Sequence, residues 1–174
     1  RDLPNKSFAI LYRTNAQSRS MEEALRKQNI PYKIYGGLSF YDRKEIKDLL
    51  AYFRMVINPE DEQSLLRIIN YPARGIGEKT VERMMVFANE HNTSIWQCIA
   101  NDQFPQDFNM GTVNRVRDFV VLIKSFQSLQ GKMNAFELAK HITNTIGIIK
   151  LLKEEDTPES ISRVENIEEL LNDL

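Results

Sequence analysis

Apolar residues recur every three to four positions over most of the chain, which is the spacing of an α-helix with one buried face. The clearest example is residues 42–57, where the apolar positions form one stripe that ends at Asn58-Pro59. The stripe consists of Ile46, Leu49, Leu50, Phe53, Val56 and Ile57. Further helices are predicted at residues 60–70, from about residue 78, at 94–100, at 112–130, and from residues 134 and 157.

Only the N-terminal part shows a different pattern. Residues 7–15 are an apolar run ending in polar residues, which is typical of a strand buried on both faces. Residues 18–29 carry helix caps, and residues 30–37 indicate a second strand that stops at Gly36 and Gly37. Strand, helix and strand at this spacing predict a βαβ unit. The predicted fold class is therefore mixed α/β, predominantly helical, with a short βαβ unit of parallel strands followed by a helical array.

The composition indicates the general class of protein but does not identify its function. The 174 residues are 42% hydrophobic and 27% charged, as in an ordinary soluble globular protein. The net charge of −1 argues against binding to nucleic acid or membrane through the overall charge of the protein. A local basic patch is compatible with this net charge. The lone Cys98 excludes an internal disulfide, and a cytoplasmic location is expected. No apolar run approaches ~18 residues, so no membrane span is expected.

The chain contains one candidate internal boundary. Residues 101–111 combine Pro105, Gly111 and polar side chains, which favour a connection between two units. The sequence opens at Arg1 without a methionine and stops inside an apparent helix. It is therefore expected to be a fragment of a longer protein.

The stretch "ARGIGEKT", residues 73–80, has the residue types of a nucleotide-binding phosphate loop but not the spacing. The motif G-x-x-x-x-G-K-[ST] needs glycine directly before the lysine, whereas here Glu78 precedes Lys79. Pro72 stands where the first glycine of that motif should be. The acidic box at residues 61–64 follows a turn instead of a buried strand, so a Mg²⁺ box is rejected as well.

Two other groups of residues could carry chemistry. Tyr12 and Arg13 follow the first predicted strand, where a ring could stack on a base and a guanidinium could clamp a phosphate. The alternative is a polar strand end with a surface arginine. The second group, Phe40, Tyr41, Arg43, Lys44 and Lys47, suits single-stranded nucleic acid, but a salt-bridged helix face explains it as well. The histidines lack partners at metal-ligand spacing, so no metal site is predicted.

Several of these blocks, in this order and spacing, resemble the superfamily-one DNA helicases of the UvrD/PcrA type. The matching blocks are residues 8–25, 30–54, 57–70, 72–80 and 162–171. The resemblance implies that residues 1–107 are the N-terminal part of the second RecA-like motor domain. It implies that residues 108–174 start the helical insertion subdomain of that motor domain.

The resemblance also implies a function for the full-length parent chain. Helicases of this type translocate 3′ to 5′ on single-stranded DNA with ATP and Mg²⁺, in repair or replication. The expected partners are DNA, single-stranded and at single/double-strand junctions, and the first motor domain of the same parent chain. By position, Tyr12 would stack on the adenine, and Arg13 would reach the γ-phosphate as a catalytic and sensing residue. The fragment alone is expected to hold neither ATP nor Mg²⁺ and to be inactive.

The resemblance shifts the interpretation of the glycine turn. Gly75 and Gly77 flank an apolar residue in the manner of helix-hairpin-helix elements, so the following helix could bind a DNA backbone with its free N–H groups. Arg74, Lys79 and Thr80 could supplement that contact. The alternative is a tight turn that needs glycine only for its dihedral angles. For the whole chain, the alternative is a stand-alone DNA-binding or protein-docking module, which would have no use for Arg13.

Overall fold

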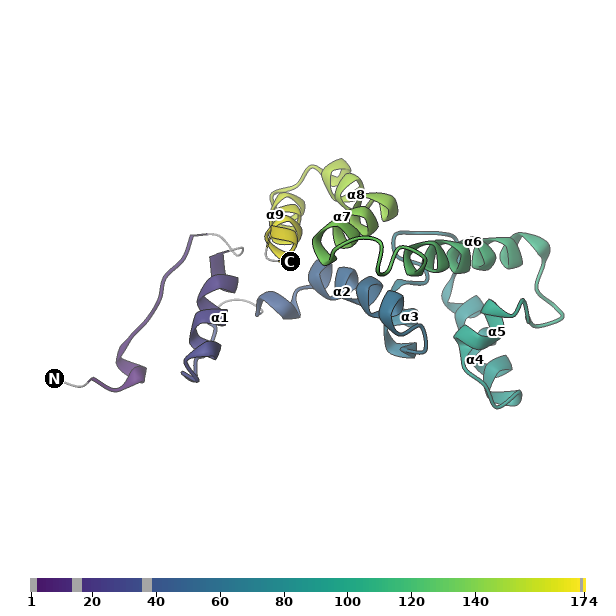
Figure 1. The fold of residues 1–174 in the computed structure, drawn as a ribbon, viewed down its shortest axis with the longest axis horizontal. Coiled ribbons are helices and arrows are strands. Elements are labelled where there is room, and N and C mark those ends of the chain that lie inside the picture. Colours follow the sequence, from purple (N-terminus) through teal and green to yellow (C-terminus); the bar gives the residue numbers. More distant parts are fainter. Residues whose placement is uncertain (1–2, 14–16, 36–38, 173) are drawn as a thin grey trace.

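The computed structural model describes residues 3–13, 17–35, 39–172 and 174, and helices make up most of them (Figure 1). The predominantly helical character predicted from the spacing is confirmed. The helices, in chain order, are η1 (Asn5–Ser7), α1 (Ser18–Lys27), η3 (Phe40–Asp42), α2 (Lys44–Ile57), α3 (Glu62–Ile68), α4 (Glu78–Glu90), α5 (Ile95–Ala100), α6 (Met110–Gln127), α7 (Ala135–Ile146), α8 (Ile148–Glu155) and α9 (Pro158–Asn172).

Local capping fixes where several helices begin. Asp61 accepts a hydrogen bond from the backbone N–H of Ser64 at the start of α3, and Ser94 does the same for Gln97 at the start of α5. Helix α7 begins with a full capping box. The Asn134 side chain accepts a hydrogen bond from the backbone N–H of Glu137, and the Glu137 side chain accepts one from the backbone N–H of Asn134. These polar residues supply acceptors that the first turn of a helix lacks, so the helix starts are encoded locally.

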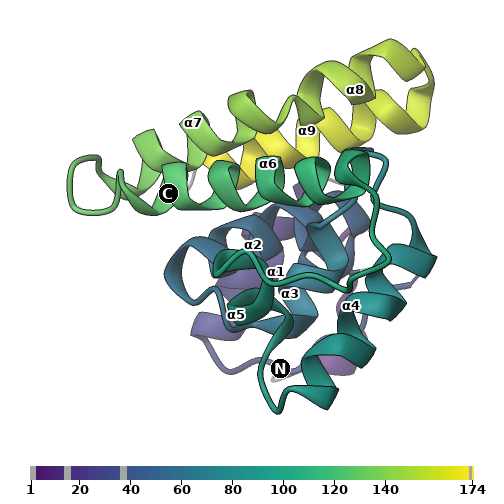
Figure 2. The same ribbon diagram turned by 90° about the vertical axis from the view of Figure 1, so that its right-hand side faces the viewer.

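Helix α2 is the centre of the helical array, and it contacts α3, α6, α7 and α9. Figure 2 shows α6 to α9 on one side of the molecule and α2 to α5 on the other. The side chains of Ile46, Leu49 and Met55 are fully buried along α2, and Phe119 and Ile123 of α6 are equally buried. Burial of these apolar side chains is the main favourable term that holds the array together.

The predicted βαβ unit is wrong. Among the described residues, no strand forms in 7–13 or 30–35, and the only β-type pairing is an isolated bridge between Gln130 and Met133. Phe8 and Leu11 are 66% and 93% exposed instead of buried on both faces. A parallel pair needs strands side by side and covering layers on both faces, and α1 alone cannot provide them. Gly36 and Gly37, the predicted end of the second strand, lie outside the described residues.

The helix predicted between those strands does form, but it buries polar residues. Helix α1 buries Ser18, Arg19 and Glu22, while Met21 is 42% exposed. In Figure 1, α1 and the extended N-terminal segment lie at one end of the molecule, and α4 and α5 lie at the other. The predicted boundary near residue 107 falls in the connection from α5 to α6, two helices that pack against each other. The division at that boundary remains a prediction.

Candidate functional site

The segment with Tyr12 and Arg13 leads into α1 and leaves both side chains accessible. Tyr12 is 37% exposed, and Arg13 is exposed. The backbone N–H of Arg13 donates to Oε1 of Gln17, the N-cap residue of α1, at 3.0 Å. Within the described part of the chain, no hydrogen bond or ion pair engages the Arg13 guanidinium. A phenol ring and a planar cation on adjacent residues can stack on a base and pair with a phosphate.

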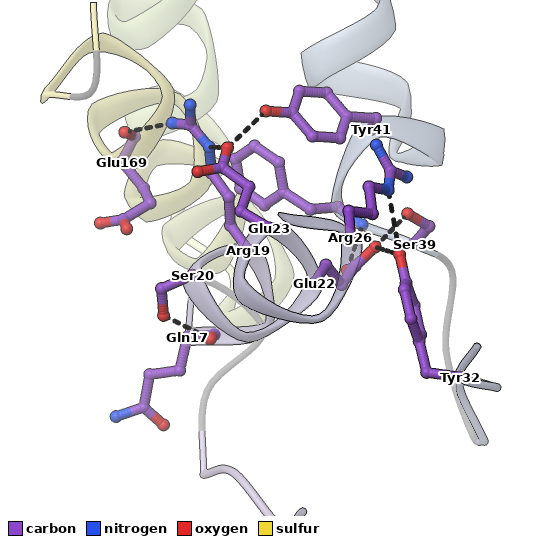
Figure 3. A network of polar contacts seen from close by, with 11 residues as sticks. Gln17, Arg19, Ser20, Glu22, Glu23, Arg26, Tyr32, Ser39, Tyr41 and Glu169 are labelled. Carbon is purple, nitrogen blue, oxygen red and sulfur yellow. Dashed lines mark hydrogen bonds and ion pairs between the residues drawn. The ribbon is translucent and has the colours of Figure 1, made fainter. Parts of the chain in front are cut away.

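The helix that follows is anchored by a buried carboxylate. Glu22 accepts hydrogen bonds from the Ser39 hydroxyl at 2.5 Å, the Phe40 backbone N–H at 3.0 Å and the Tyr32 hydroxyl at 3.1 Å. Figure 3 shows these side chains converging on one side of α1. Nearby, the Tyr41 hydroxyl donates to Glu23 at 2.8 Å and lowers the pKa of that carboxyl below its ordinary value. Polar contacts therefore hold α1 against the segment that starts α2.

Two buried arginines extend this network to α9. Arg19 donates from Nη1 to the Glu169 carbonyl at 2.8 Å (Figure 3). Its guanidinium lies 5.2 Å from the centre of the Phe40 ring. Arg43 donates to the Ser18 hydroxyl at 3.0 Å and to the side-chain carbonyl of Asn166 at 2.7 Å. Burial lowers the pKa of Arg43, because it disfavours the charged form. These residues lie inside the molecule.

That placement bears on the aromatic and basic group around residues 40–47. Phe40 is fully buried and Arg43 is only 7% exposed, while Lys44 and Lys47 are exposed. Lys47 forms an ion pair with Asp42 at 2.8 Å, and Lys44 lies over the Tyr71 ring. The geometry agrees with a salt-bridged helix face around a buried centre.

The two glycines of the "ARGIGEKT" turn are under different constraints. Gly75 has φ of +73°, which other residues rarely adopt, and a Cβ there would lie 3.2 Å from Nε of Arg115, so a side chain at this position would strain the turn. Gly77 has φ of −74°, and nothing lies within 4 Å of the position of a Cβ. The fold therefore does not require glycine at residue 77. Ile76 between them is 1% exposed and fixes the turn in the core.

Arg74 points into the molecule. Its guanidinium donates to the carbonyls of Ile68 at 3.0 Å and Pro72 at 3.1 Å, and to the Tyr52 hydroxyl at 2.5 Å. The Tyr52 hydroxyl in turn donates to the Tyr71 carbonyl at 2.5 Å. Burial raises the pKa of Tyr52 to about 12. Arg74 thus closes the end of α3 and supports the turn from inside.

Lys79 and Thr80 lie in the first turn of α4. Lys79 is exposed and Thr80 is half-buried, and the backbone N–H of Thr80 bonds back to the Gly77 carbonyl at 2.9 Å. The sequence did not suggest Arg115, an exposed residue of α6 whose side chain lies against Gly75. Its position far along the chain gave no spacing signal that could have found it. The turn thus brings the backbone of two glycines and the start of α4 close to two exposed cations, Lys79 and Arg115.

Neither metal-binding groups nor membrane-spanning helices are found in residues 3–13, 17–35, 39–172 and 174. No group of three or more His, Cys, Asp or Glu side chains there could hold a metal ion. No helix in that part of the chain is long and apolar enough to cross a membrane.

Comparison with known proteins gives consistent matches along the chain. A family model described as the UvrD-like helicase C-terminal domain matches residues 1–173. The ATP-dependent DNA helicase PcrA of Staphylococcus aureus strain Mu50 is 41% identical over 167 residues, which cover 96% of this chain and 23% of that helicase. The PcrA helicases of Bacillus subtilis strain 168 and Leuconostoc citreum are 42% and 36% identical over 165 residues, covering 95% of this chain and 22% of each relative. The chain thus spans less than a quarter of the length of these relatives.

Proposed function

The chain belongs to the family of UvrD-like helicase C-terminal domains, and from this membership we propose that it works as part of an ATP-dependent DNA helicase. The observation that carries the proposal is the family match over residues 1–173, together with 41% identity to a PcrA helicase over 96% of the chain. The accessibility of Arg13 beside Tyr12 is consistent with the same function, because both side chains are free to contact a nucleotide.

In this proposal, the chain supplies one wall of an ATP site. Tyr12 stacks on the adenine, and Arg13 contacts the γ-phosphate of ATP that is bound mainly by the first motor domain of the same parent chain. A guanidinium that enters from across a cleft stabilises the charge that develops on the transferred phosphoryl group. It also senses whether the γ-phosphate is present. Mg²⁺ would be held by other parts of the parent chain, since the acidic box at residues 61–64 is part of the α3 cap.

The second proposed role is a contact with the DNA backbone at the start of α4. Gly77 supports this role, because its backbone needs no glycine and the space beside it is open, so a sugar-phosphate chain can approach closely. Lys79 and Thr80 add a cation and a hydroxyl in the first helical turn, where backbone N–H groups favour anions. Arg74 stabilises the turn through its hydrogen bonds to backbone carbonyls, and Gly75 adopts the positive φ that the turn requires.

Further details of the parent function belong to the same proposal. They are translocation 3′ to 5′ on single-stranded DNA, action at single/double-strand junctions in repair or replication, and a cytoplasmic location. Residues 1–107 would belong to the second motor domain, and residues 108–174 would start its helical insertion.

The nucleotide role is tested by Arg13→Ala in the full-length parent helicase. Turnover should fall by ~10³-fold or more while ATP affinity changes much less, because the contact acts mostly in the transition state. Arg13→Lys should restore little, since an ammonium lacks the planar fork. Arg54→Ala, which removes another exposed arginine, is the matched control. A kcat for Arg13→Ala within a few-fold of wild type would return Arg13 to an ordinary surface residue and favour the binding-module alternative.

A further inference from the structure

A buried asparagine stands between two buried charges of opposite sign. Asn166 of α9 is 2% exposed, and Arg43 and Glu45 are 7% and 5% exposed. The Asn166 side-chain carbonyl accepts from Nη1 of Arg43 at 2.7 Å, and its amide donates to Oε1 of Glu45 at 2.7 Å. The amide therefore uses an acceptor toward the cation and a donor toward the carboxylate. No apolar residue could satisfy both charged groups in this position.

The same arginine connects α9 to α1. Arg43 donates its other terminal nitrogen to the hydroxyl of Ser18, the first residue of α1, at 3.0 Å. One residue further, Arg19 donates to the Glu169 carbonyl on α9 at 2.8 Å. We call these six residues, Ser18, Arg19, Arg43, Glu45, Asn166 and Glu169, the α1–α9 joint. Helix α1 is thus fixed to a helix about 150 positions away in sequence.

The joint lies between the two proposed contact sites. On one side, the N-cap residue of α1 accepts a hydrogen bond from the backbone of Arg13. On the other side, α9 contacts α2, and α2 contacts α3, the helix that leads into the glycine turn. In Figure 1, α2 and α9 lie between α1 at one end and α4 at the other. Any displacement of α1 must therefore move α9 with it or break buried hydrogen bonds.

We propose that Asn166 is a positioning residue for nucleotide-dependent DNA binding, and that the α1–α9 joint couples the nucleotide contact near Arg13 to the helices that carry the DNA contact. This inference rests on the proposed function at both of those sites. Buried, fully bonded polar networks suit such a role, because they have discrete bonded arrangements and do not deform gradually. The coupling is a difference in DNA affinity between nucleotide states.

The chemistry of the joint supplies a selective way to break and restore it. Asn166→Asp retains an acceptor for Arg43 but places a second carboxylate against Glu45, where the donor to Glu45 is lost. In the double variant Asn166→Asp, Glu45→Gln, the carboxylate and the amide exchange positions. The aspartate then accepts from Arg43 and from the new glutamine amide, so both hydrogen bonds and the summed charge return.

The experiment uses the full-length parent helicase and a fluorescent single-stranded oligonucleotide. Its Kd is measured with and without a non-hydrolysable ATP analogue, and the ratio of the two values reports the coupling. Couplings of this kind are roughly 5- to 150-fold. The ratio should fall toward 1 in Asn166→Asp and return in the double variant, while the Kd without nucleotide stays near that of wild type. Ser160→Ala is the control, because Ser160 is also buried on α9 but bonds only to Thr157 in its own turn.

Each outcome decides between the joint and mere packing. A folded Asn166→Asp variant with the wild-type ratio overturns the proposal. If that variant does not fold, Ser18→Ala, which removes only one hydroxyl of the joint, should lower the ratio, and an unchanged ratio would overturn the proposal instead. A folded double variant whose ratio stays near 1 would also overturn the proposal. A wild-type ratio of 1 is a different result, because it would show that the parent does not couple nucleotide to DNA and would remove the proposed function on which the inference rests.

Discussion

Helices α1 and α2 are held in the molecule by opposite means. Helix α2 buries an apolar face that includes Ile46, Leu49 and Met55, and it contacts α3, α6, α7 and α9. Helix α1 buries Arg19 and Glu22, while Met21 is 42% exposed and residues 3–13 are exposed. Apolar packing is non-directional and tolerates small adjustments, whereas a buried charge network depends on directional hydrogen bonds between particular partners. Apolar burial therefore accounts for the stability of the helical array, and directional hydrogen bonds fix the position of α1.

The first prediction contrasts the same kind of truncation in the two helices. Leu49→Ala on α2 should lower the free energy of unfolding by about 2–5 kcal/mol, because it leaves a cavity in a fully buried site. Met21→Ala on α1 should change it by less than about 0.5 kcal/mol, since that side chain is 42% exposed. Urea unfolding of both variants measures the difference. Equal losses would show that α1 also depends on apolar packing.

This contrast explains which parts of the fold could be predicted from sequence. A helix closes its hydrogen bonds within a few residues, so spacing and caps such as Asp61 and Ser94 predict it directly. A strand needs a partner that its own sequence does not contain, and residues 7–13 have none among the described residues. The apolar stripe was also too broad, because Ile57 is 76% exposed.

The candidate sites could be predicted only in part, for a similar reason. The family resemblance pointed to Tyr12, Arg13 and the glycine turn, but the strand predicted to position Tyr12 and Arg13 does not form in residues 7–13. The inward direction of Arg74 depends on Tyr52 and on carbonyls at the end of α3, which no local pattern reveals. The α1–α9 joint spans about 120 to 150 positions, so its members had no common motif.

The second prediction uses the one buried hydroxyl group on the apolar face of α2. The pKa of Tyr52 is raised from 10.0 to about 12, so the folded state keeps its proton over a range where the unfolded chain loses it. Its contribution is fully present below pH 10 and is lost as pH rises from about 10 to 12, in total about 3 kcal/mol. In Tyr52→Phe this part of the alkaline loss should vanish. Urea unfolding at several pH values measures it, with Tyr35→Phe, at an 81% exposed residue, as the control.

A third prediction concerns the polar anchoring of α1. Glu22→Gln replaces a carboxylate that accepts from Ser39, Phe40 and Tyr32 by an amide that cannot accept at both ends. The loss should be about 2 kcal/mol, typical of hydrogen bonds to a buried charged group. Hydrogen exchange should show reduced protection first in α1. Glu82→Gln, at an exposed position of α4, is the control and should have no effect. Unchanged protection in α1 would contradict the polar anchoring.

The smallest expected effect separates binding from folding at the start of α4. Lys79 is exposed, so Lys79→Ala should leave stability unchanged and remove one of the phosphate contacts proposed for the parent helicase. The slope of log affinity against log salt concentration should then flatten by about 0.7–0.9, equally for all DNA sequences. Lys132→Ala, at an exposed position away from the turn, is the control. Arg74→Ala cannot replace this test, because it removes hydrogen bonds that hold the turn. Gly77→Ser is a second suitable variant, because serine is a good N-cap and nothing lies within 4 Å of a Cβ at this position. The fold should be kept, and DNA should bind more weakly because the added side chain hinders the close approach of its backbone. If both variants bind DNA with the wild-type salt slope and affinity, the turn serves only to connect α3 and α4.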